Sequence, residues 1–118
     1  MNLLVADDNQ EAAELIQKRL MKKGHKVDIA FDGRKALDLI KVNAYEMVFL
    51  DHDMPEITGL ELIKYIKENG FKAKTVMITG YPEMEGFAAH DFGADEYLVK
   101  PVNLTDIEAL IEKYSKLS

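Results

Sequence analysis

The sequence contains no cysteine, no long apolar run and fewer basic than acidic residues. Without cysteine the chain forms neither a disulfide framework nor a thiolate zinc site, which fits a reducing compartment. Its N-terminal segment, MNLLVADD, is too short for a membrane span and lacks the basic flank of a signal peptide. Because 21 acidic residues exceed 15 basic ones, the net charge of −6 repels nucleic-acid phosphates and anionic membranes. We therefore expect a cytoplasmic protein that inserts into no membrane and binds no nucleic acid directly.

The chain has 118 residues, of which 47% are apolar, enough to fill one compact core. We therefore expect one domain over residues 1–118. The final segment, Ile111–Ser118, closes a predicted helix and leads into no linker. This ending favours a single-domain protein whose output is an unspecified partner chain; the alternative is a piece cut from a longer protein.

Five short apolar runs alternate with amphipathic segments along the chain. None of these runs alternates strictly between apolar and polar residues, as expected of strands that are buried on both faces. The predicted strands are Leu3–Ala6, Val27–Ala30, Met47–Leu50, Val76–Ile78 and Tyr97–Val99. The clearest helical face, with i, i+3, i+4, i+7 spacing, consists of Ile107, Leu110, Ile111 and Tyr114. This order predicts an α/β fold: a doubly wound sheet of five parallel strands with right-handed crossovers and five helices.

Capping residues and glycines mark the expected helix boundaries. The signals are capping boxes at Thr58–Glu61 and Thr105–Glu108 and helix-ending glycines at Gly24 and Gly70. The segment Glu83–Phe92 has the weakest helical pattern, because Gly86 lies inside it. We expect this fourth helix to be the most mobile element.

Polar side chains follow four of the five predicted strands. They are Asp7 and Asp8 after the first, Asp51 and Asp53 after the third, Thr79 after the fourth and Lys100 after the fifth. In a doubly wound sheet the ligand site lies beyond the carboxyl ends of the strands. Several carboxylates at one edge repel one another unless their pKa values rise or a cation binds. An all-oxygen ligand set suits Mg²⁺.

With such a metal, a carboxylate can attack phosphorus and form an aspartyl-phosphate. The remaining groups supply charge compensation. Lys100 offers a positive charge to one phosphoryl oxygen and Thr79 offers a hydroxyl donor to another. The sequence therefore indicates phosphoryl transfer at this edge of the sheet.

Four motifs, VADDN, FLDHDMPEITG, VMITG and GADEYLVKP, occur in this order. They closely resemble the response-regulator receiver family of two-component signalling, of the single-domain, chemotaxis-regulator-like kind. The resemblance implies a flavodoxin-like strand order of 2-1-3-4-5 and Mg²⁺ as cofactor. It also implies that a histidine kinase or a histidine phosphotransfer protein donates the phosphoryl group. The protein is then a phosphoacceptor rather than an enzyme, with only self-phosphorylation and autodephosphorylation chemistry.

The resemblance also assigns roles to individual residues. Asp51 is the phosphoacceptor, and Asp8 and the backbone carbonyl of Asp53 are direct Mg²⁺ ligands, with Asp7 assisting through water. The switch residues are Thr79 and Tyr97, the phosphate-pairing residue is Lys100, and the Lys100–Pro101 bond is cis. The signal is expected to leave through the surface built from the fourth helix, the fifth strand and the fifth helix.

Two positions are expected to tune the lifetime of the phosphoryl group. In the resembled family, the residues two beyond the acceptor and two beyond the switch threonine flank the phosphoryl group; here they are Asp53 and Tyr81. Asp53 either orients a hydrolytic water or repels it. Tyr81 is expected to shield the phosphoryl group, because Gly80 beside it leaves the backbone free to fold the ring inward. Gly80 and the short segment 79–93 depart from the usual family pattern.

Simpler interpretations apply to several of these residues when each is taken alone. Asp7, Asp8 or Asn9 can cap the first helix, and an acid such as Asp51 commonly begins a turn. His52 is expected at an exposed or partly packed position rather than as a metal ligand, and His25 and His90 are expected at the surface.

Two other functions compete with the receiver interpretation. A phosphotransferase of the haloacid-dehalogenase type also has an Asp-x-Asp motif, here Asp51 and Asp53, but carries it on its first strand and is usually longer. A pseudo-receiver binds partners without phosphorylation, which a missing acid, acceptor or lysine would favour. Incubation with a small phosphodonor and Mg²⁺ separates the two kinds of receiver, because only the true receiver forms an aspartyl adduct.

Overall fold

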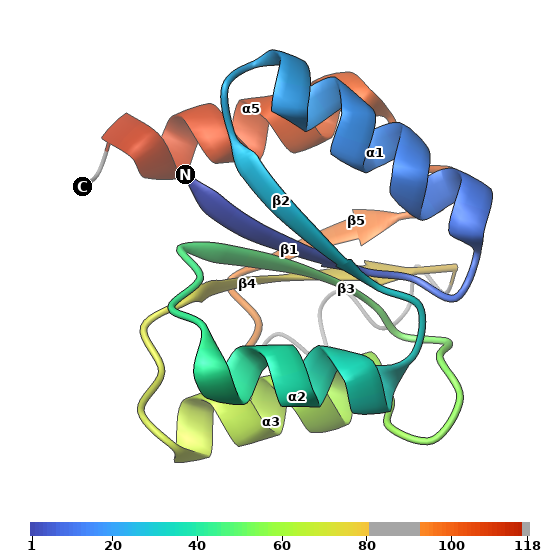
Figure 1. Ribbon diagram of the computed structural model, residues 1–118, viewed down its shortest axis with the longest axis vertical. Coiled ribbons are helices and arrows are strands. Elements are labelled where there is room, and N and C mark those ends of the chain that lie inside the picture. The colour runs from blue at the N-terminus through green and yellow to red at the C-terminus, as the bar shows by residue number, and fades with distance from the viewer. Residues whose placement is uncertain (81–92, 117–118) are drawn as a thin grey trace.

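The computed structural model describes residues 1–80 and 93–116 as a sheet covered by helices on both faces (Figure 1). The strands are β1 (Asn2–Ala6), β2 (Lys26–Ala30), β3 (Met47–Asp51), β4 (Lys74–Thr79) and β5 (Glu96–Val99). The helices are α1 (Gln10–Lys22), α2 (Gly33–Val42), α3 (Gly59–Glu68) and α5 (Leu104–Lys116). All strand pairs are parallel and the order is β2-β1-β3-β4-β5, which confirms the predicted doubly wound, flavodoxin-like fold.

The two faces of the sheet carry separate apolar cores, one beneath α1 and α5 and the other beneath α2 and α3 (Figure 1). Strand β3 shows how the sequence divides its side chains between them. Met47 and Phe49 join the first core, whereas Val48 and Leu50 join the second. Successive strand residues point to opposite faces, so a central strand that is apolar throughout supplies both cores.

Each predicted strand is present, and each is longer than expected by one to three residues. Strand β3 includes Asp51, so the acceptor predicted to follow the strand is its last residue. The helix predicted over Glu83–Phe92, with Gly86 inside it, lies outside the described residues. Among the described helices, none is both long and apolar enough to cross a membrane.

Most of the predicted helix boundaries are confirmed. Thr58 and Glu61 form the expected capping box at the start of α3. Gly24 and Gly70 adopt positive φ angles of 92° and 70°, the left-handed conformation that glycine allows most readily at a helix end.

The capping box predicted at Thr105–Glu108 is wrong, because α5 begins one residue before Thr105. The Asn103 side chain accepts a hydrogen bond from the amide of Thr105 at 2.8 Å. Asn103 thus accepts from an amide in the first turn of α5. Thr105 was expected to accept in the same way from the amide of Glu108, three residues further on.

Candidate functional site

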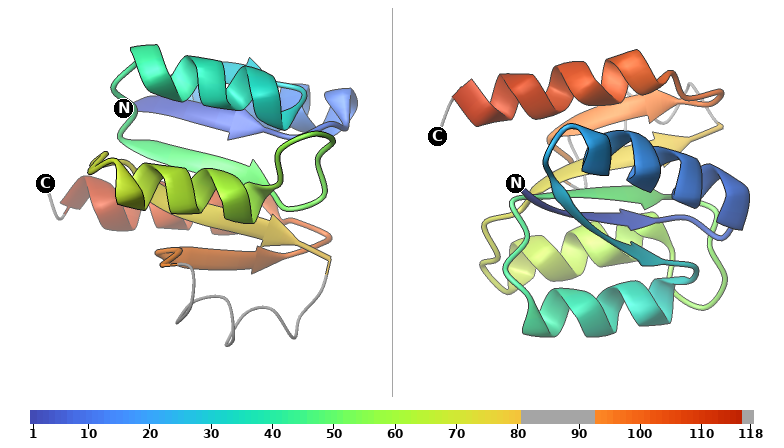
Figure 2. Two further views of the ribbon diagram at one scale, coloured as in Figure 1. Left: turned by 90° about the horizontal axis from the view of Figure 1, so that it is seen from below. Right: turned by 45° about the horizontal axis from the view of Figure 1, so that its top comes forward.

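The site lies where the carboxyl ends of the parallel strands meet, at the edge toward which all the strand arrows point (Figure 2). Asp7, Asp8 and Asp51 each place a carboxylate oxygen within 4.8 Å of the other two. Asp51 is fully buried and Asp7 nearly so, whereas Asp8 is exposed. Three residues that the sequence placed after β1 and β3 are therefore brought together as predicted.

Lys100 compensates the charge of this carboxylate group. Its Nζ donates a hydrogen bond to Asp51 Oδ2 at 2.9 Å, and its own amide is fixed by the carbonyl of Thr79 at 2.8 Å. Burial acts to lower the pKa of Lys100, but the hydrogen bond and charge of Asp51 outweigh it, so the pKa is raised. The side chain therefore remains an ammonium group directed at Asp51.

Two backbone amides hold the acidic side chains in place. The amide of Asn9 donates to Asp7 Oδ1 at 2.9 Å, and the amide of Asp53 donates to Asp51 Oδ1 at 3.0 Å. Both are turns in which an aspartate accepts from the residue two positions later. Sequence reasoning did not identify these contacts, although an aspartate at a strand end followed by turn residues is their usual signal.

Asp7 shows the electrostatic cost of this arrangement. Burial raises the pKa of Asp7 to about 6, and the hydrogen bond and negative charge of Asp51 act in the same direction, against the Asn9 amide and Lys100. One lysine thus does not balance three carboxylates. Three convergent carboxylate oxygens with excess negative charge fit a hard divalent cation, and Mg²⁺ is the ion whose ligands are of this type.

The two predicted switch residues lie on neighbouring strands. Thr79 is buried at the end of β4, opposite Val99, and Tyr97 lies on β5 opposite Met77, two residues before Thr79 along β4. Burial raises the pKa of the Tyr97 phenol. Its hydroxyl oxygen is shielded from solvent and has no hydrogen-bond partner among residues 1–80 and 93–116. The ring is therefore packed by its apolar body while its polar end is unsatisfied within the described part of the chain.

The remaining predicted residues differ in how far they are exposed to solvent. Asp53 is exposed two residues after Asp51, and the Lys100–Pro101 bond is cis as predicted. His52 is partly packed, in agreement with the prediction. His25, predicted at the surface, is half-buried instead, and its Nδ1 lies 3.1 Å from the α-amino nitrogen of Met1. Tyr81 and His90 lie outside the described residues.

A groove runs from the carboxylates along α1 and the segment after β5. Its wall is largely apolar, formed by Ala12, Leu15, Ile16, Pro101, Val102 and Leu104. Leu15 is 57% exposed and lies in this wall beside other apolar side chains. An apolar surface therefore continues from the acidic site onto the outside of the molecule.

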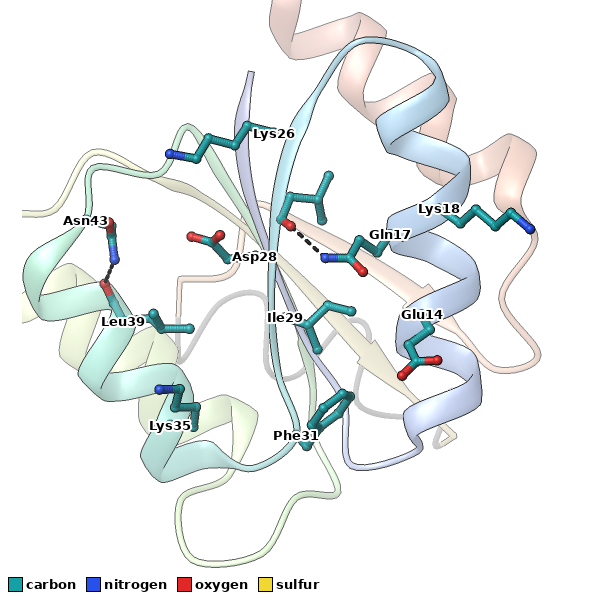
Figure 3. A pocket seen from close by; sticks show the side chains of 11 residues that line it. Glu14, Gln17, Lys18, Lys26, Asp28, Ile29, Phe31, Lys35, Leu39 and Asn43 are labelled. Atoms are coloured by element: carbon teal, nitrogen blue, oxygen red, sulfur yellow. Dashed lines mark hydrogen bonds between the residues drawn. The ribbon is translucent and has the colours of Figure 1, made fainter.

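A second hollow lies over the edge strand β2 between α1 and α2 (Figure 3). Its lining mixes charged, amide and apolar side chains, and none of the predicted site residues belongs to it. Gln17 reaches across from α1 and its Nε2 donates to the Val27 carbonyl at 2.8 Å. The hollow thus follows an open sheet edge and has no part in the carboxylate site.

Comparison with known proteins points to one family. The model of the response regulator receiver domain matches residues 3–112. The transcriptional regulatory protein DltR of Streptococcus agalactiae is 35% identical over 122 residues, covering all of this chain and 53% of that protein. The response regulator MprA of Mycolicibacterium vanbaalenii is 36% identical over 110 residues, covering 92% of this chain and 48% of that protein. The chain thus spans about half the length of these curated relatives.

Solved structures agree with the sequence matches. The Francisella response regulator 1452 receiver domain has a TM-score of 0.91 at 27% identity, covering 99% of this chain and 98% of that one. The response regulator TrrA from Thermotoga maritima, in complex with Mg²⁺-BeF, has a TM-score of 0.85 at 32% identity. That match covers 96% of this chain and 97% of the TrrA chain.

Proposed function

Because the chain belongs to the response-regulator receiver family, we propose that it accepts a phosphoryl group on Asp51 from a histidine kinase or a histidine phosphotransfer protein. The observation that carries this proposal is the environment of Asp51. Its carboxylate is fully buried, held by Lys100 and the Asp53 amide, and close to the carboxylates of Asp7 and Asp8. No other described acid combines burial, a lysine partner and neighbouring carboxylates.

We place Mg²⁺ at the three carboxylates of Asp7, Asp8 and Asp51, together with the backbone carbonyl of Asp53. The oxygen donors and the excess negative charge of the site support this assignment. When bound, Mg²⁺ neutralises the negative charge that develops during phosphoryl transfer. The TrrA structure, solved with Mg²⁺-BeF, is a relative in which this ion is present.

The residues of the chain then divide the chemistry among them. A carboxylate oxygen of Asp51 attacks phosphorus, the new O–P bond forms, and the N–P bond of the donor phosphohistidine breaks as its electrons return to the imidazole. Lys100 already hydrogen-bonds to the acceptor and pairs with one phosphoryl oxygen. The hydroxyl of Thr79 donates to another.

The apolar groove beside the site supports docking of a phosphodonor protein. It begins at Asp7 and Lys100 and continues past Leu15 and Pro101, so a histidine entering between them reaches Asp51 from a surface able to bury apolar side chains. The proposed donor is therefore a protein rather than a small metabolite alone. Leu15→Asp is expected to slow transfer from a protein donor while labelling by a small phosphodonor stays normal.

We place the output surface on the predicted fourth helix, β5 and α5. Through this surface the phosphorylated state controls a protein target, which is another chain or another part of a longer protein that contains this chain. Thr79 and Tyr97 lie on the strands that border this surface. A phosphoryl group that draws Thr79 toward itself favours one of two arrangements there.

Thr79→Ala should accept phosphate, yet phosphorylation should leave the amide exchange of β5 unchanged in this variant. Equal exchange changes in the parent and variant would contradict this coupling.

Asp53 and Tyr81 are proposed to set the lifetime of the aspartyl-phosphate. Asp53 is exposed next to the acceptor, which leaves its carboxylate on the solvent side of the site. Tyr81→Ala should shorten the half-life without moving the labelling site, because the ring no longer excludes water. A half-life equal to or longer than that of the parent would show that Tyr81 points away from the phosphate.

The decisive experiment is incubation with acetyl phosphate and Mg²⁺, followed by intact-mass and peptide mass spectrometry after hydroxylamine treatment. The parent should gain one phosphoryl group on Asp51. Asp51→Asn should gain none, whereas the matched control Asp53→Asn should still be labelled. An adduct on Asp53 or Asp7 would overturn the assignment, and no adduct in the parent would favour the pseudo-receiver function.

A further inference from the structure

Gly33, the first residue of α2, lies against the loop that follows Asp51, the proposed acceptor, at the end of β3. This loop, residues 52–58, joins β3 to α3 and is called here the acceptor loop. We infer that Gly33 is a positioning residue for metal binding: its missing side chain lets the acceptor loop sit where the Asp53 carbonyl reaches the cation. The inference rests on the function proposed above, since it assigns the metal ligand of that site.

The close approach is between Gly33 and the backbone of Ile57. A β-carbon at Gly33 would overlap the carbonyl oxygen of Ile57 and lie 2.7 Å from both the carbonyl carbon and the Cβ of that residue. Carbon atoms in favourable contact are about 3.5–4.0 Å apart, so either the helix or the loop must move. Gly33 has no positive φ, unlike Gly24 and Gly70. Space, and not backbone conformation, therefore requires glycine here.

Helix α2 is too firmly held to be the part that moves. Its first turn is capped by Asp32, whose Oδ1 accepts from the amide of Lys35 at 2.7 Å. One and two turns further on, Ala36 and Ile40 are buried in the core beneath the sheet. Shifting the helix would disturb that core at both positions, whereas the acceptor loop buries only Met54 in it and leaves its other residues partly or fully exposed.

The acceptor loop is short and tied at both ends, so a shift at Ile57 reaches Asp53. At its start the Asp53 amide binds Asp51 and the Met54 amide binds the His52 carbonyl at 3.1 Å. At its end Thr58 caps α3. Between these points Glu56 adopts a positive φ of 69°, a conformation that non-glycine residues keep only where their surroundings hold them.

A side chain at Gly33 therefore acts on the metal ligand without touching it. Pushing Ile57 outward turns the segment that contains the Asp53 carbonyl and its amide, and the latter holds the acceptor carboxylate. Changes in the residues that orient metal ligands typically weaken metal affinity by about 10–100-fold. Gly33→Ala should thus change Mg²⁺ affinity beyond any loss of overall stability.

The test compares Gly33→Ala with Gly24→Ala by Mg²⁺ titration of the unphosphorylated protein and by thermal unfolding. Gly24 has a positive φ of 92°, and a β-carbon added there would meet no atom within 4 Å, so its substitution costs stability without touching the acceptor loop. We expect Mg²⁺ binding to weaken about tenfold in Gly33→Ala and not in Gly24→Ala. Equal Mg²⁺ affinities in the two variants would overturn the inference.

A measurement on the parent protein covers the case in which Gly33→Ala does not fold. In amide NMR spectra, Mg²⁺ should shift the signals of Gly33 and Ile57 together with that of Asp53, while Gly24 and Gly70 stay in place. An unmoved Gly33 signal at saturating Mg²⁺ would also overturn the inference. Because no phosphodonor is present, this result is separate from the labelling of Asp51, and failure of that labelling would count against the proposed function alone.

Discussion

The sheet has an amino edge, where its parallel strands begin, and a carboxyl edge, where they end. Acidic side chains have opposite roles at these two edges. At the amino edge, where β4 and β5 begin, Asp95 is surrounded by donors. Its Oδ2 accepts from the amide and the hydroxyl of Thr75, at 2.8 and 3.2 Å, and from Lys67 at 3.4 Å. This carboxylate ties the start of two strands together.

Glu96, the next residue along, is satisfied in the same manner. Its Oε2 accepts from Lys113 at 2.7 Å and from the hydroxyl of Tyr114 at 2.5 Å. Burial acts to raise the pKa of Glu96, but these hydrogen bonds outweigh it and hold the pKa below its ordinary value of 4.5. The fold therefore favours the charged form of Glu96.

At the carboxyl edge the acids face one another. Asp7, Asp8 and Asp51 converge, Lys100 hydrogen-bonds only Asp51 among them, and the pKa of Asp7 is raised to about 6. Acidic side chains therefore stabilise the fold where hydrogen-bond donors surround them. Where donors are few and the acids face one another, the excess negative charge favours binding of a cation. Substitutions at the two edges should accordingly differ in size and sign.

Removing the lysine at each edge gives the largest expected contrast. Lys100→Met leaves the buried Asp51 carboxylate without its cation, and the free energy of unfolding of the metal-free protein should fall by about 2–3 kcal/mol. Lys67→Met breaks a more exposed pair with Asp95 and should cost less than about 1 kcal/mol. Urea unfolding at neutral pH measures both. Equal losses of unfolding free energy in the two variants would contradict the electrostatic difference between the two edges.

The next largest effect is expected at Asp95. Asp95→Ala leaves the Thr75 amide without its side-chain acceptor, which should lower the free energy of unfolding by about 1–2 kcal/mol. Mg²⁺ affinity should not change, because Asp95 lies at the edge away from the metal site. Weaker Mg²⁺ binding in this variant would show that the two edges are coupled.

Asp7→Asn should have the opposite sign. Asparagine keeps an oxygen for the Asn9 amide but removes a buried charge beside Asp51, so the metal-free protein should gain on the order of 1 kcal/mol. The melting temperature should rise without metal, and Mg²⁺ should raise it less than in the parent. A lower melting temperature without metal would contradict the repulsion inferred at this edge.

The smallest effect is the pH dependence expected at Glu96. Because its folded pKa lies below the unfolded value, its contribution to stability is present above about pH 4.5 and is lost as the pH falls through the folded pKa. Glu96→Gln should therefore be a few tenths of a kcal/mol less stable than the parent at pH 7, and the difference should shrink in acid. Thermal unfolding across a pH series measures this, and a constant difference would refute it.

Much of the fold and the carboxylate site could be predicted because both depend on regularities of the chain. Apolar runs identify the strands, and the carboxyl ends of parallel strands meet at one edge, so Asp7, Asp51 and Lys100 had to come together. The roles assigned to these residues remain predictions until labelling and metal titration are done.

What the sequence did not predict depends on contacts between distant segments or on competition between neighbours. Asn103 replaces Thr105 at the start of α5 because both can cap and only the local backbone decides between them. The approach of Gly33 to Ile57 joins residues 24 positions apart and has no pattern in either segment alone. The contact between His25 and the α-amino group of Met1 likewise joins residues 24 positions apart in the chain.

Among the described strands β2 pairs on one side only, with β1, and an unpaired sheet edge is a place where a strand of another molecule can add. The hydrogen bond from Gln17 to the Val27 carbonyl already occupies one of the groups that such a strand would need. An incoming strand must break this bond before it can pair there. Gln17 therefore reduces by one the backbone groups that β2 offers to an added strand.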